Sequence, residues 1–304
     1  LMSTGIAKNG VTSFLPTTMT MSSKDIYGAL DVVRECMEKS LNGAKVLGAH
    51  MEGPFINRIY KGAQPEQYVI KPSYEFIKDY TDVIRLISYA PEMDEDYSFT
   101  KDVKEKTDIT LSIGHTNATY DQAKEAFSLG CSHVTHLFNA MTPLNHREPG
   151  VVGASLTSDV FTELIADTIH VNKQLFQFVL DNKGKEKIVL ITDSMRAGCM
   201  KDGQYDLGGQ PVVVKDGVAR LESGNLAGSV LTLNKAIYNF LQNTNATVAE
   251  VIHMASLNPA TSIGVSNRKG SLEIGKDADI AIFDEEMNCY LSIVEGREVY
   301  NQLY

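Results

Sequence analysis

The sequence predicts an α/β fold: a (β/α)8 TIM-like barrel whose first strand is absent from this chain, with a small β-sandwich satellite domain. Short β-prone runs alternate with helical segments up to Asp193, which indicates a parallel sheet with right-handed crossovers. The runs recur roughly every 20 to 35 residues, as one β/α unit per strand requires. At least five runs end in a polar side chain, as barrel strands do at the rim that carries the chemistry.

Seven strands are expected before Asp193. They cover residues 11–15, 45–49, 83–90, 109–113, 133–135, 162–166 and 188–192. An open doubly wound sheet could also hold seven strands, but it would gather its ligand groups at one switch point. Polar residues at the ends of many strands favour the barrel instead. Because a barrel of this kind has eight strands, we expect the missing strand to precede Leu1.

Helices are expected between these strands and after the last of them. They cover residues 22–42, 74–80, 99–106, 120–129, 173–181, 231–244 and 248–255, and residues 1–10 read as the tail of another. Ser22 or Ser23 is expected to cap the first, and Asn117 the one that starts at residue 120. The first strand is expected to stop at Pro16, since proline removes a ladder donor.

The pattern changes after Asp193. Residues 202–224 carry three glycine-containing turns between short alternating runs, which predicts a β-hairpin insertion. Residues 279–300 read as a β meander. We therefore divide the chain into a barrel domain at residues 1–265, with the insertion at about 202–224, and the C-terminal strands of a small β domain at residues 266–304.

Composition excludes several classes of protein. The 304-residue chain has 43% hydrophobic and 22% charged residues, which is ordinary for a globular protein. A formal net charge of -10 disfavours nucleic acid and anionic membranes as partners. We find no apolar run of membrane-spanning length. The four cysteines are scattered without a C-x-x-C pair, so we expect no disulfide framework or thiolate zinc site, and a cytoplasmic location.

The strand ends supply a set of residues that could bind a metal. Glu52, His115, His136, His170 and Asp193 each lie at or just after a predicted strand. Taken alone, His136 could be an ordinary core histidine, but the repetition favours a shared site. A carboxylate with two imidazoles suits Zn²⁺ with an open position for water. The remaining carboxylate, Asp193, could act as general base and acid, and His170 could polarise a carbonyl or hold substrate.

Several motifs resemble those of the N-acetylglucosamine-6-phosphate deacetylase family of the amidohydrolase superfamily. They occur in the family's order from about Val11 to the C-terminus. The motifs are residues 50–55 (HMEGPF), 114–118 (GHTNA), 135–141 (THLFNAM), 147–150 (REPG), 165–170 (IADTIH), 192–193 (TD), 226–229 (LAGS), 258–260 (NPA), 269–271 (KGS) and 275–279 (GKDAD).

The resemblance implies a role for each matching position. Glu52, His115 and His136 would be the metal ligands, and Asp193 the catalytic acid/base that serves a metal-activated water. Arg147 would reach the substrate phosphate of a neighbouring subunit in a homodimer. The implied cofactor is a divalent cation, Zn²⁺ first, with Fe, Co or Mn as alternatives and one or two ions per subunit. The implied substrate contacts are Ala63, Gln64, Asn139, Ala140, Asp167, His170, Leu226, Ala227 and Gly228.

Two departures from the family pattern are visible. No His-x-His pair occurs in the sequence, and Thr168 stands where the family commonly has glycine. His50, two residues before Glu52, is expected to support the site rather than bind the metal. Two other functions stay open: another amidohydrolase, such as an N-acyl amino acid deacylase or a cyclic amidase, and a catalytically silent barrel that binds sugar phosphates.

Overall fold

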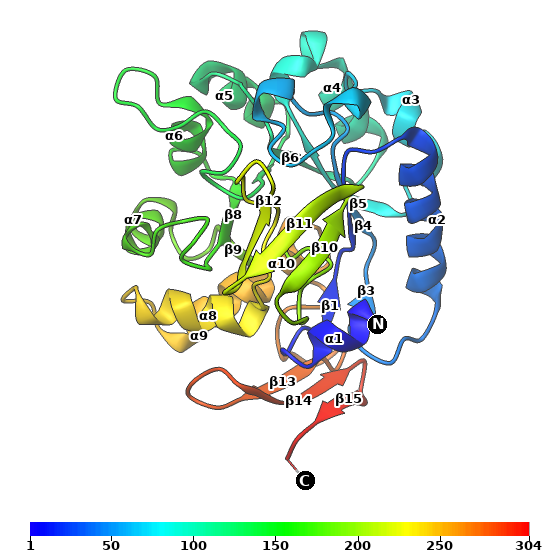
Figure 1. Ribbon diagram of the computed structural model, residues 1–304, viewed down its shortest axis with the longest axis vertical. Helices are drawn as coiled ribbons and strands as arrows, with labels where there is room; N and C mark the ends of the chain where they lie inside the picture. Colours follow the sequence, from blue (N-terminus) through cyan, green and yellow to red (C-terminus); the bar gives the residue numbers. More distant parts are fainter. Residues whose placement is uncertain (304) are drawn as a thin grey trace.

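The centre of the molecule is a curled parallel sheet with helices on its outer side (Figure 1). The structure is a computed structural model that describes residues 1–303. Seven strands follow one another in chain order around the sheet, which confirms the predicted TIM-like architecture. The strands are β2 (Thr17–Thr18), β4 (Ala49–Glu52), β5 (Ile84–Tyr89), β6 (Thr110–Ile113), β7 (His133–Val134), β8 (Phe161–Ile165) and β9 (Ile188–Ile191).

The first two predicted strands are each split into two pieces. β1 (Ser13–Phe14) pairs in parallel with β3 (Lys45–Val46), and the extended chain then continues as β2 beside β4. The first predicted strand does end before Pro16, at Phe14, but pairing resumes at Thr17, which was not predicted. Although Pro16 has no N–H to donate, its carbonyl still accepts a hydrogen bond of 3.1 Å from the backbone N–H of His50.

Most predicted helices are present within a few residues of their expected bounds. Ser22 caps α2 by accepting a hydrogen bond from the backbone N–H of Asp25, and α2 ends at Glu38 rather than near residue 42. The confirmed helices are α1 (Met2–Ala7), α2 (Ser23–Glu38), α3 (Tyr74–Ile77), α4 (Ser98–Lys106), α5 (Tyr120–Ser128), α7 (Gln174–Lys183), α8 (Leu233–Gln242) and α9 (Val248–Ala255).

Two further helices were not predicted, and one predicted cap is wrong. α6 (Gly150–Leu156) follows a proline and contains two glycines, and α10 (Leu257–Ser262) contains a proline, so propensity gave no signal for either. The cap of α5 is Thr119, not Asn117. Thr119 and Gln122 form a reciprocal capping box, in which each side chain accepts the other residue's backbone N–H.

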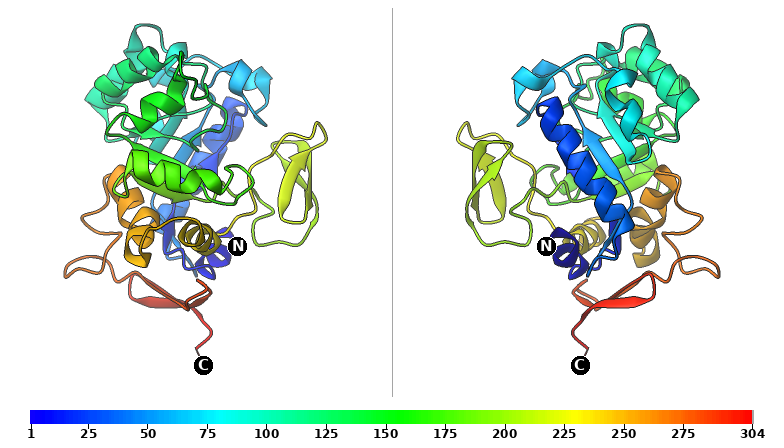
Figure 2. Two further views of the ribbon diagram at one scale, coloured as in Figure 1. Left: turned by 90° about the vertical axis from the view of Figure 1, so that its left-hand side faces the viewer. Right: turned by 90° about the vertical axis from the view of Figure 1, so that its right-hand side faces the viewer.

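Two small antiparallel sheets flank the barrel. The predicted insertion forms β10 (Gly203–Leu207), β11 (Gln210–Lys215) and β12 (Val218–Leu221), which stand apart at one side in Figure 2. The predicted meander forms β13 (Ile280–Phe283), β14 (Cys289–Val294) and β15 (Arg297–Asn301). This last sheet lies below α1 (Figure 1), and the Ser292 hydroxyl donates a 2.7 Å hydrogen bond to the Ala7 carbonyl.

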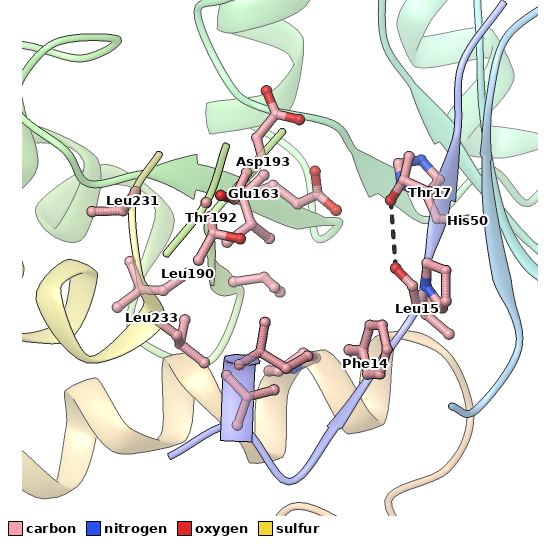
Figure 3. Close-up of a pocket in the computed structure, with 18 of the residues that line it drawn as sticks. Phe14, Leu15, Thr17, His50, Glu163, Leu190, Thr192, Asp193, Leu231 and Leu233 are labelled. Carbon is pink, nitrogen blue, oxygen red and sulfur yellow. Dashed lines mark hydrogen bonds between the residues drawn. The ribbon is translucent and has the colours of Figure 1, made fainter. Parts of the chain in front are cut away.

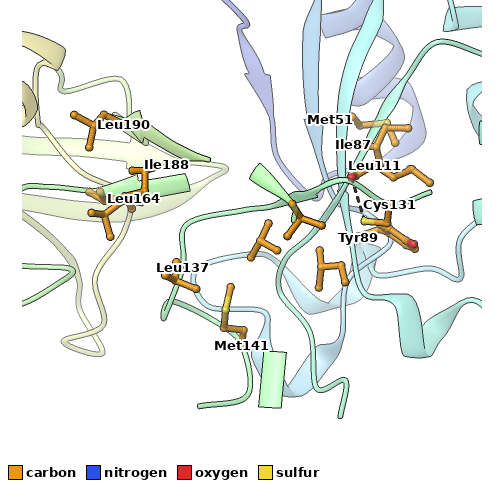
Figure 4. Close-up of a cluster of buried hydrophobic side chains, with 14 of the residues drawn as sticks. Met51, Ile87, Tyr89, Leu111, Cys131, Leu137, Met141, Leu164, Ile188 and Leu190 are labelled. Atoms are coloured by element: carbon orange, nitrogen blue, oxygen red, sulfur yellow. Dashed lines mark hydrogen bonds between the residues drawn. The ribbon is translucent and has the colours of Figure 1, made fainter. Parts of the chain in front are cut away.

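The two sides of the central sheet differ in polarity. Met51, Ile87 and Leu111 are paired across β4, β5 and β6 and belong to the hydrophobic cluster drawn in Figure 4. On the other face, polar residues occur toward the carboxyl ends of β5 and β6, where Ser88 pairs with Ser112. Because successive side chains of a strand point to opposite faces, the apolar residues pack under the helices while the polar ones face the barrel interior.

The helices are too short or too polar to cross a membrane. Across residues 1–303, none combines the length and the apolar character that crossing a bilayer would need.

The capping box gives a test of the corrected helix start. Thr119→Ala should lower the free energy of unfolding by about 1 kcal/mol, because it removes the acceptor for the N–H of Gln122. Asn117→Ala should change it by less than about 0.5 kcal/mol, since this side chain is exposed. Denaturant titration followed by circular dichroism measures both. A larger loss for Asn117→Ala would mean that Asn117 is the cap after all.

Candidate metal centre

Three side chains converge at the carboxyl ends of neighbouring strands. Glu52 ends β4, while His115 and His136 follow β6 and β7. His115 Nε2 lies 2.7 Å and His136 Nε2 lies 3.3 Å from the same Glu52 carboxylate oxygen, Oε1. All three residues are buried. They form the metal-capable cluster found within the described residues, as the sequence predicted.

The backbone at these strand ends adopts an unusual conformation. His115, His136 and Asp193 have φ values of 49°, 33° and 47°, in the left-handed region that non-glycine residues seldom occupy. Such conformations cost about 1 to 3 kcal/mol each and persist where the surrounding structure enforces them, often at functional sites. Here they occur at three of the strand ends that carry the predicted chemistry.

The hydrogen bonds of the two rings fix which nitrogen can bind a cation. His115 Nδ1 is 2.8 Å from the Tyr60 carbonyl oxygen, and His136 Nδ1 is 3.1 Å from that of Asn139. Since a carbonyl only accepts, each Nδ1 is the donor, and a neutral ring then keeps a lone pair on Nε2. The two Nε2 atoms lie only 3.2 Å apart. Two lone pairs and a carboxylate oxygen that face one another fit a divalent cation between them.

The electrostatics of the cluster agree with this arrangement. Burial alone would lower the pKa of His136, but the hydrogen bond to Glu52 and the charge of that carboxylate outweigh it and raise the pKa to about 9. Burial would raise the pKa of Glu52, but its hydrogen bonds with His115 and His136 hold it well below its usual range. Glu52 is therefore a carboxylate at neutral pH, ready to bind a cation.

Asp193 faces β2 and β4 across the cavity (Figure 3). Figure 3 shows Asp193, Thr192 and Leu190 along one side of the cavity, and Thr17 and His50 along the other. Burial raises the pKa of the Asp193 carboxyl to about 6, and the charge of Glu52 acts in the same direction, against the lowering effect of nearby histidines. A carboxyl that titrates near neutrality is suited to take up and return a proton.

His170 is held in place by Asp167. The Asp167 carboxylate accepts hydrogen bonds from the backbone N–H groups of Ile169 and His170, both at 2.8 Å, and its Oδ2 lies 2.6 Å from His170 Nδ1. This carboxylate is thus committed to the loop and to the imidazole. His170 lines the cavity and presents its free Nε2, while Asp167 lies behind it.

The cavity has a volume of about 2740 Å³ and extends along the gap between β2 and β9, the two end strands of the sheet. Glu52, His115, His136 and Asp193 line it. Among the predicted substrate contacts, the structure brings Ala63, Gln64, Asn139, Ala140, His170, Leu226 and Gly228 to its wall. Ala227 is fully buried beside them. Arg147 is exposed on the loop that precedes α6.

Two predicted contacts use their polar atoms within the protein. The Gln64 side-chain oxygen accepts a 2.7 Å hydrogen bond from the backbone N–H of Thr20. The Ala63 carbonyl accepts one of 2.6 Å from the side chain of Gln210, which lies on β11 of the insertion. The insertion therefore holds the loop that carries residues 61–64.

Glu163 is a site residue that sequence reasoning missed. It lies on β8, where it is buried, and its carboxylate accepts a 3.2 Å hydrogen bond from the backbone N–H of His136. Burial raises its pKa to about 8. The available signal was a single carboxylate inside the otherwise apolar or neutral run at residues 161–166, because charged residues are rarely buried without a partner.

The interior below the ligands carries a continuous set of hydrogen bonds. His50 Nε2 is 2.7 Å from the Ser88 hydroxyl, which bonds the Thr135 hydroxyl at 2.5 Å. Thr135 bonds the Ser112 hydroxyl at 2.6 Å, and Ser112 bonds His133 Nδ1 at 3.0 Å. Burial lowers the pKa of His50 to about 4 and of His133 to about 3. His50 is thus a neutral supporting residue, as expected.

The fold and the site together define a metal-dependent hydrolase on a TIM-like barrel. The amidohydrolase family profile matches residues 1–301. The N-acetylglucosamine-6-phosphate deacetylase of Bacillus subtilis (strain 168) is 40% identical over 97% of this chain and 76% of that protein. The chain belongs to the amidohydrolase family and, within it, to the N-acetylglucosamine-6-phosphate deacetylases.

Two further comparisons define this relationship. The crystal structure of N-acetylglucosamine-6-phosphate deacetylase from Thermotoga maritima matches with a TM-score of 0.93 and 35% identity, over 99% of this chain and 82% of that chain. The N-acetylgalactosamine-6-phosphate deacetylase of Escherichia coli O157:H7 is 38% identical over 96% of this chain and 78% of that protein. The resemblance found in the motifs therefore extends over nearly the whole sequence.

The raised pKa of His136 predicts how metal affinity depends on pH. In metal-free protein His136 holds a proton below pH 9, which a cation must displace. The apparent affinity for Zn²⁺ should therefore rise about tenfold per pH unit from pH 7 to 9 and level off above. Calorimetry in buffers of different ionisation enthalpy should detect about one released proton per ion at pH 7. An affinity that does not change over this range would contradict the prediction.

The same ion pair sets a stability window for metal-free protein. The pKa of His136 is raised above its ordinary value of 6.5. Its ion pair with Glu52 therefore contributes in full to the free energy of unfolding below pH 6.5, and this contribution is lost as the pH rises through 9.

Proposed function

We propose that this protein hydrolyses the acetamide of N-acetyl-D-glucosamine 6-phosphate to D-glucosamine 6-phosphate and acetate. The observation that supports this most is the convergence of Glu52, His115 and His136 on one point of a cavity that Asp193 also lines. The activity is that of the relatives by which the chain was placed in its family.

The proposed cation is Zn²⁺, with Fe, Co or Mn as alternatives. One carboxylate and two imidazoles are borderline ligands that suit these ions, and three protein ligands leave a position open for water. We propose one ion at Glu52, His115 and His136, while a second would need ligands beyond this set. When bound, such a cation would acidify a water and polarise the acetamide carbonyl.

The proposed mechanism assigns the proton transfers to Asp193. Its carboxylate takes the proton of the attacking water and then gives it to the departing amine, so that one group serves as base and acid in turn. His170, held by Asp167 through Nδ1, would donate from Nε2 to the oxygen that becomes negative in the transition state.

The substrate contacts are proposed from the cavity wall. We propose that Ala63, Gln64, Asn139, Ala140 and His170 hold the sugar and the acetamide. The backbone at Leu226, Ala227 and Gly228 would close the opposite side, and Asp167 would act through His170.

We propose that the protein works as a homodimer in the cytoplasm. Arg147 is exposed and is not among the residues that line its own cavity, which supports a role in the neighbouring subunit's site, where its guanidinium would bind the phosphate in bidentate fashion. The cysteines are free throughout the described residues, which agrees with a reducing compartment.

Acetate release by wild-type protein supplied with Zn²⁺ and N-acetylglucosamine 6-phosphate tests the function. Asp193→Asn should reduce kcat by about 100- to 10,000-fold, because the amide cannot accept the proton of the attacking water. Asp159→Asn, at an exposed carboxylate paired with Lys187, is the matched control and should keep wild-type turnover. Full turnover by Asp193→Asn would remove Asp193 from the mechanism.

Substrate comparison separates the alternatives. Equal kcat/KM without the 6-phosphate would favour another amidohydrolase, such as an N-acyl amino acid deacylase or a cyclic amidase. A higher kcat/KM for the galactosamine epimer would favour the activity named for the Escherichia coli relative. Binding of the sugar phosphate without turnover, even with metal supplied, would indicate a silent barrel.

The role of Arg147 predicts complementation between subunits. Arg147→Ala should raise KM for the phosphorylated substrate by about tenfold or more with little change in kcat, whereas Arg297→Ala, exposed on β15, should change neither. Mixing Arg147→Ala with Asp193→Asn subunits at low substrate should restore about a quarter of wild-type activity, because half the dimers then contain one complete site. Mixtures that stay inactive although subunits exchange would exclude the shared site.

A further inference from the structure

Glu92 joins two loops of the site although it does not contact the three metal-capable side chains. It lies on the short 3-10 helix η4 (Pro91–Met93), directly after β5. Its Oε1 accepts hydrogen bonds from the Asn57 side chain at 3.0 Å and from the backbone N–H of Asn117 at 2.5 Å. Its Oε2 accepts one of 2.6 Å from the Thr116 hydroxyl. The donors come from two loops, the first after β6 and the second after β4.

The first of these loops carries a metal-capable histidine. Thr116 directly follows His115 and is fully buried. Its backbone N–H donates a 3.1 Å hydrogen bond to the carbonyl of Ala140, one of the residues that line the cavity. Through the Thr116 hydroxyl, Glu92 therefore holds the chain immediately after His115, in addition to the backbone hydrogen bond to Ala140.

The second loop carries the hydrogen-bond partner of the same imidazole. Asn57 donates its backbone N–H to the His115 carbonyl at 2.8 Å. Its side-chain oxygen accepts the N–H of Ile59 at 2.8 Å and so starts the 3-10 helix η1 (Arg58–Tyr60). The carbonyl of Tyr60, at the end of η1, then receives His115 Nδ1 at 2.8 Å.

We propose that Glu92 is a positioning residue of the metal centre, which holds His115 in the ring orientation and the tautomer that leave Nε2 free for the cation. The contacts form one sequence: Glu92 orients Asn57, Asn57 starts η1, and η1 presents the Tyr60 carbonyl to His115. Partners behind a ligand commonly set its basicity and orientation in this way. The inference rests on the proposed function only in taking the cluster to be a metal site.

A carboxylate is the group that these donors require. All three contacts place an N–H or O–H against Glu92 oxygens, and hydrogen bonds to a charged acceptor are about twice as strong as neutral ones. A glutamine could keep its oxygen toward the two N–H donors only by turning its NH2 group toward the Thr116 hydroxyl, which would then have to accept instead of donate, and the negative charge would be lost at unchanged side-chain size. Glu92→Gln is therefore a nearly isosteric probe of the contact.

The test is the affinity of the full chain for Zn²⁺, measured by competition with a chromophoric chelator. Glu92→Gln should bind Zn²⁺ about 10- to 100-fold more weakly and release it correspondingly faster. Glu95→Gln is the matched control: three residues further on, Glu95 is exposed and pairs with Lys71, so its affinity for Zn²⁺ should be that of wild type. Circular dichroism of each variant verifies that it is folded.

A second variant separates positioning from general stability. Thr116→Val removes one donor to Glu92 with little change in shape, and the Thr116→Val/Glu92→Gln pair should lose less affinity than the sum of the single losses, because both act through one contact. Wild-type affinity for Zn²⁺ in folded Glu92→Gln, with only a lower unfolding temperature, would overturn the proposal. So would strictly additive losses in the pair.

The result does not depend on the substrate. If Glu92→Gln weakens Zn²⁺ binding while wild-type protein fails to release acetate, the proposed function is contradicted and the role of Glu92 is supported. If wild-type protein releases acetate and Glu92→Gln binds Zn²⁺ as wild type does, the proposed function is supported and the role of Glu92 is contradicted.

Discussion

Two imidazole nitrogens 3.2 Å apart, facing one carboxylate oxygen, are the constraint on which this structure depends. Each ring has already used its Nδ1 on a backbone carbonyl, so the remaining lone pairs face one another and Glu52. Such an arrangement is stable only with positive charge between the groups. A shared proton supplies it in metal-free protein, as the raised pKa of His136 indicates, and a divalent cation would replace that proton.

The barrel meets this constraint by dividing its sheet into an apolar outer side and a polar inner side. Met51, Ile87 and Leu111 pack outward into the hydrophobic core, while inward residues of these strands and of β7 form the hydrogen-bonded set from His50 to His133. Buried polar groups are tolerated only when they are bonded. Because the polar groups of the interior are hydrogen-bonded to one another, the charged ligands can lie at the strand ends without unpaired polar groups beneath them.

The fold was predictable where the same pattern recurs along the chain, a β-prone run that ends in a polar residue. Seven β-prone runs, most of them followed by a helical segment, sufficed for the sheet, and polar residues after those runs identified Glu52, His115, His136 and Asp193. Prediction failed where the tertiary context decides: strand pairing continues past Pro16 through its carbonyl, and α6 forms despite two glycines.

The supporting residues were harder to find than the ligands. Glu92 and Glu163 bind loops and backbone N–H groups, and no local spacing in the sequence records which distant N–H a carboxylate will meet. The partners of the Asp167 carboxylate, His170 and the loop around it, were likewise not visible in the sequence. Ligand positions follow from strand periodicity, but partners of ligands follow from how loops pack.

The chemistry and the substrate fit are built on different parts of the chain. The metal-capable residues follow strands, whose positions the sheet fixes, while the predicted sugar contacts lie on long loops. The insertion steadies two of these loops: Gln210 bonds the Ala63 carbonyl, and the Ala219 carbonyl accepts the N–H of Ala227. Relatives of similar identity are named for the glucosamine and the galactosamine substrates. Because those sugars differ at a hydroxyl and not at the acetamide, discrimination between them must come from the loops and the insertion rather than from the ligand cluster.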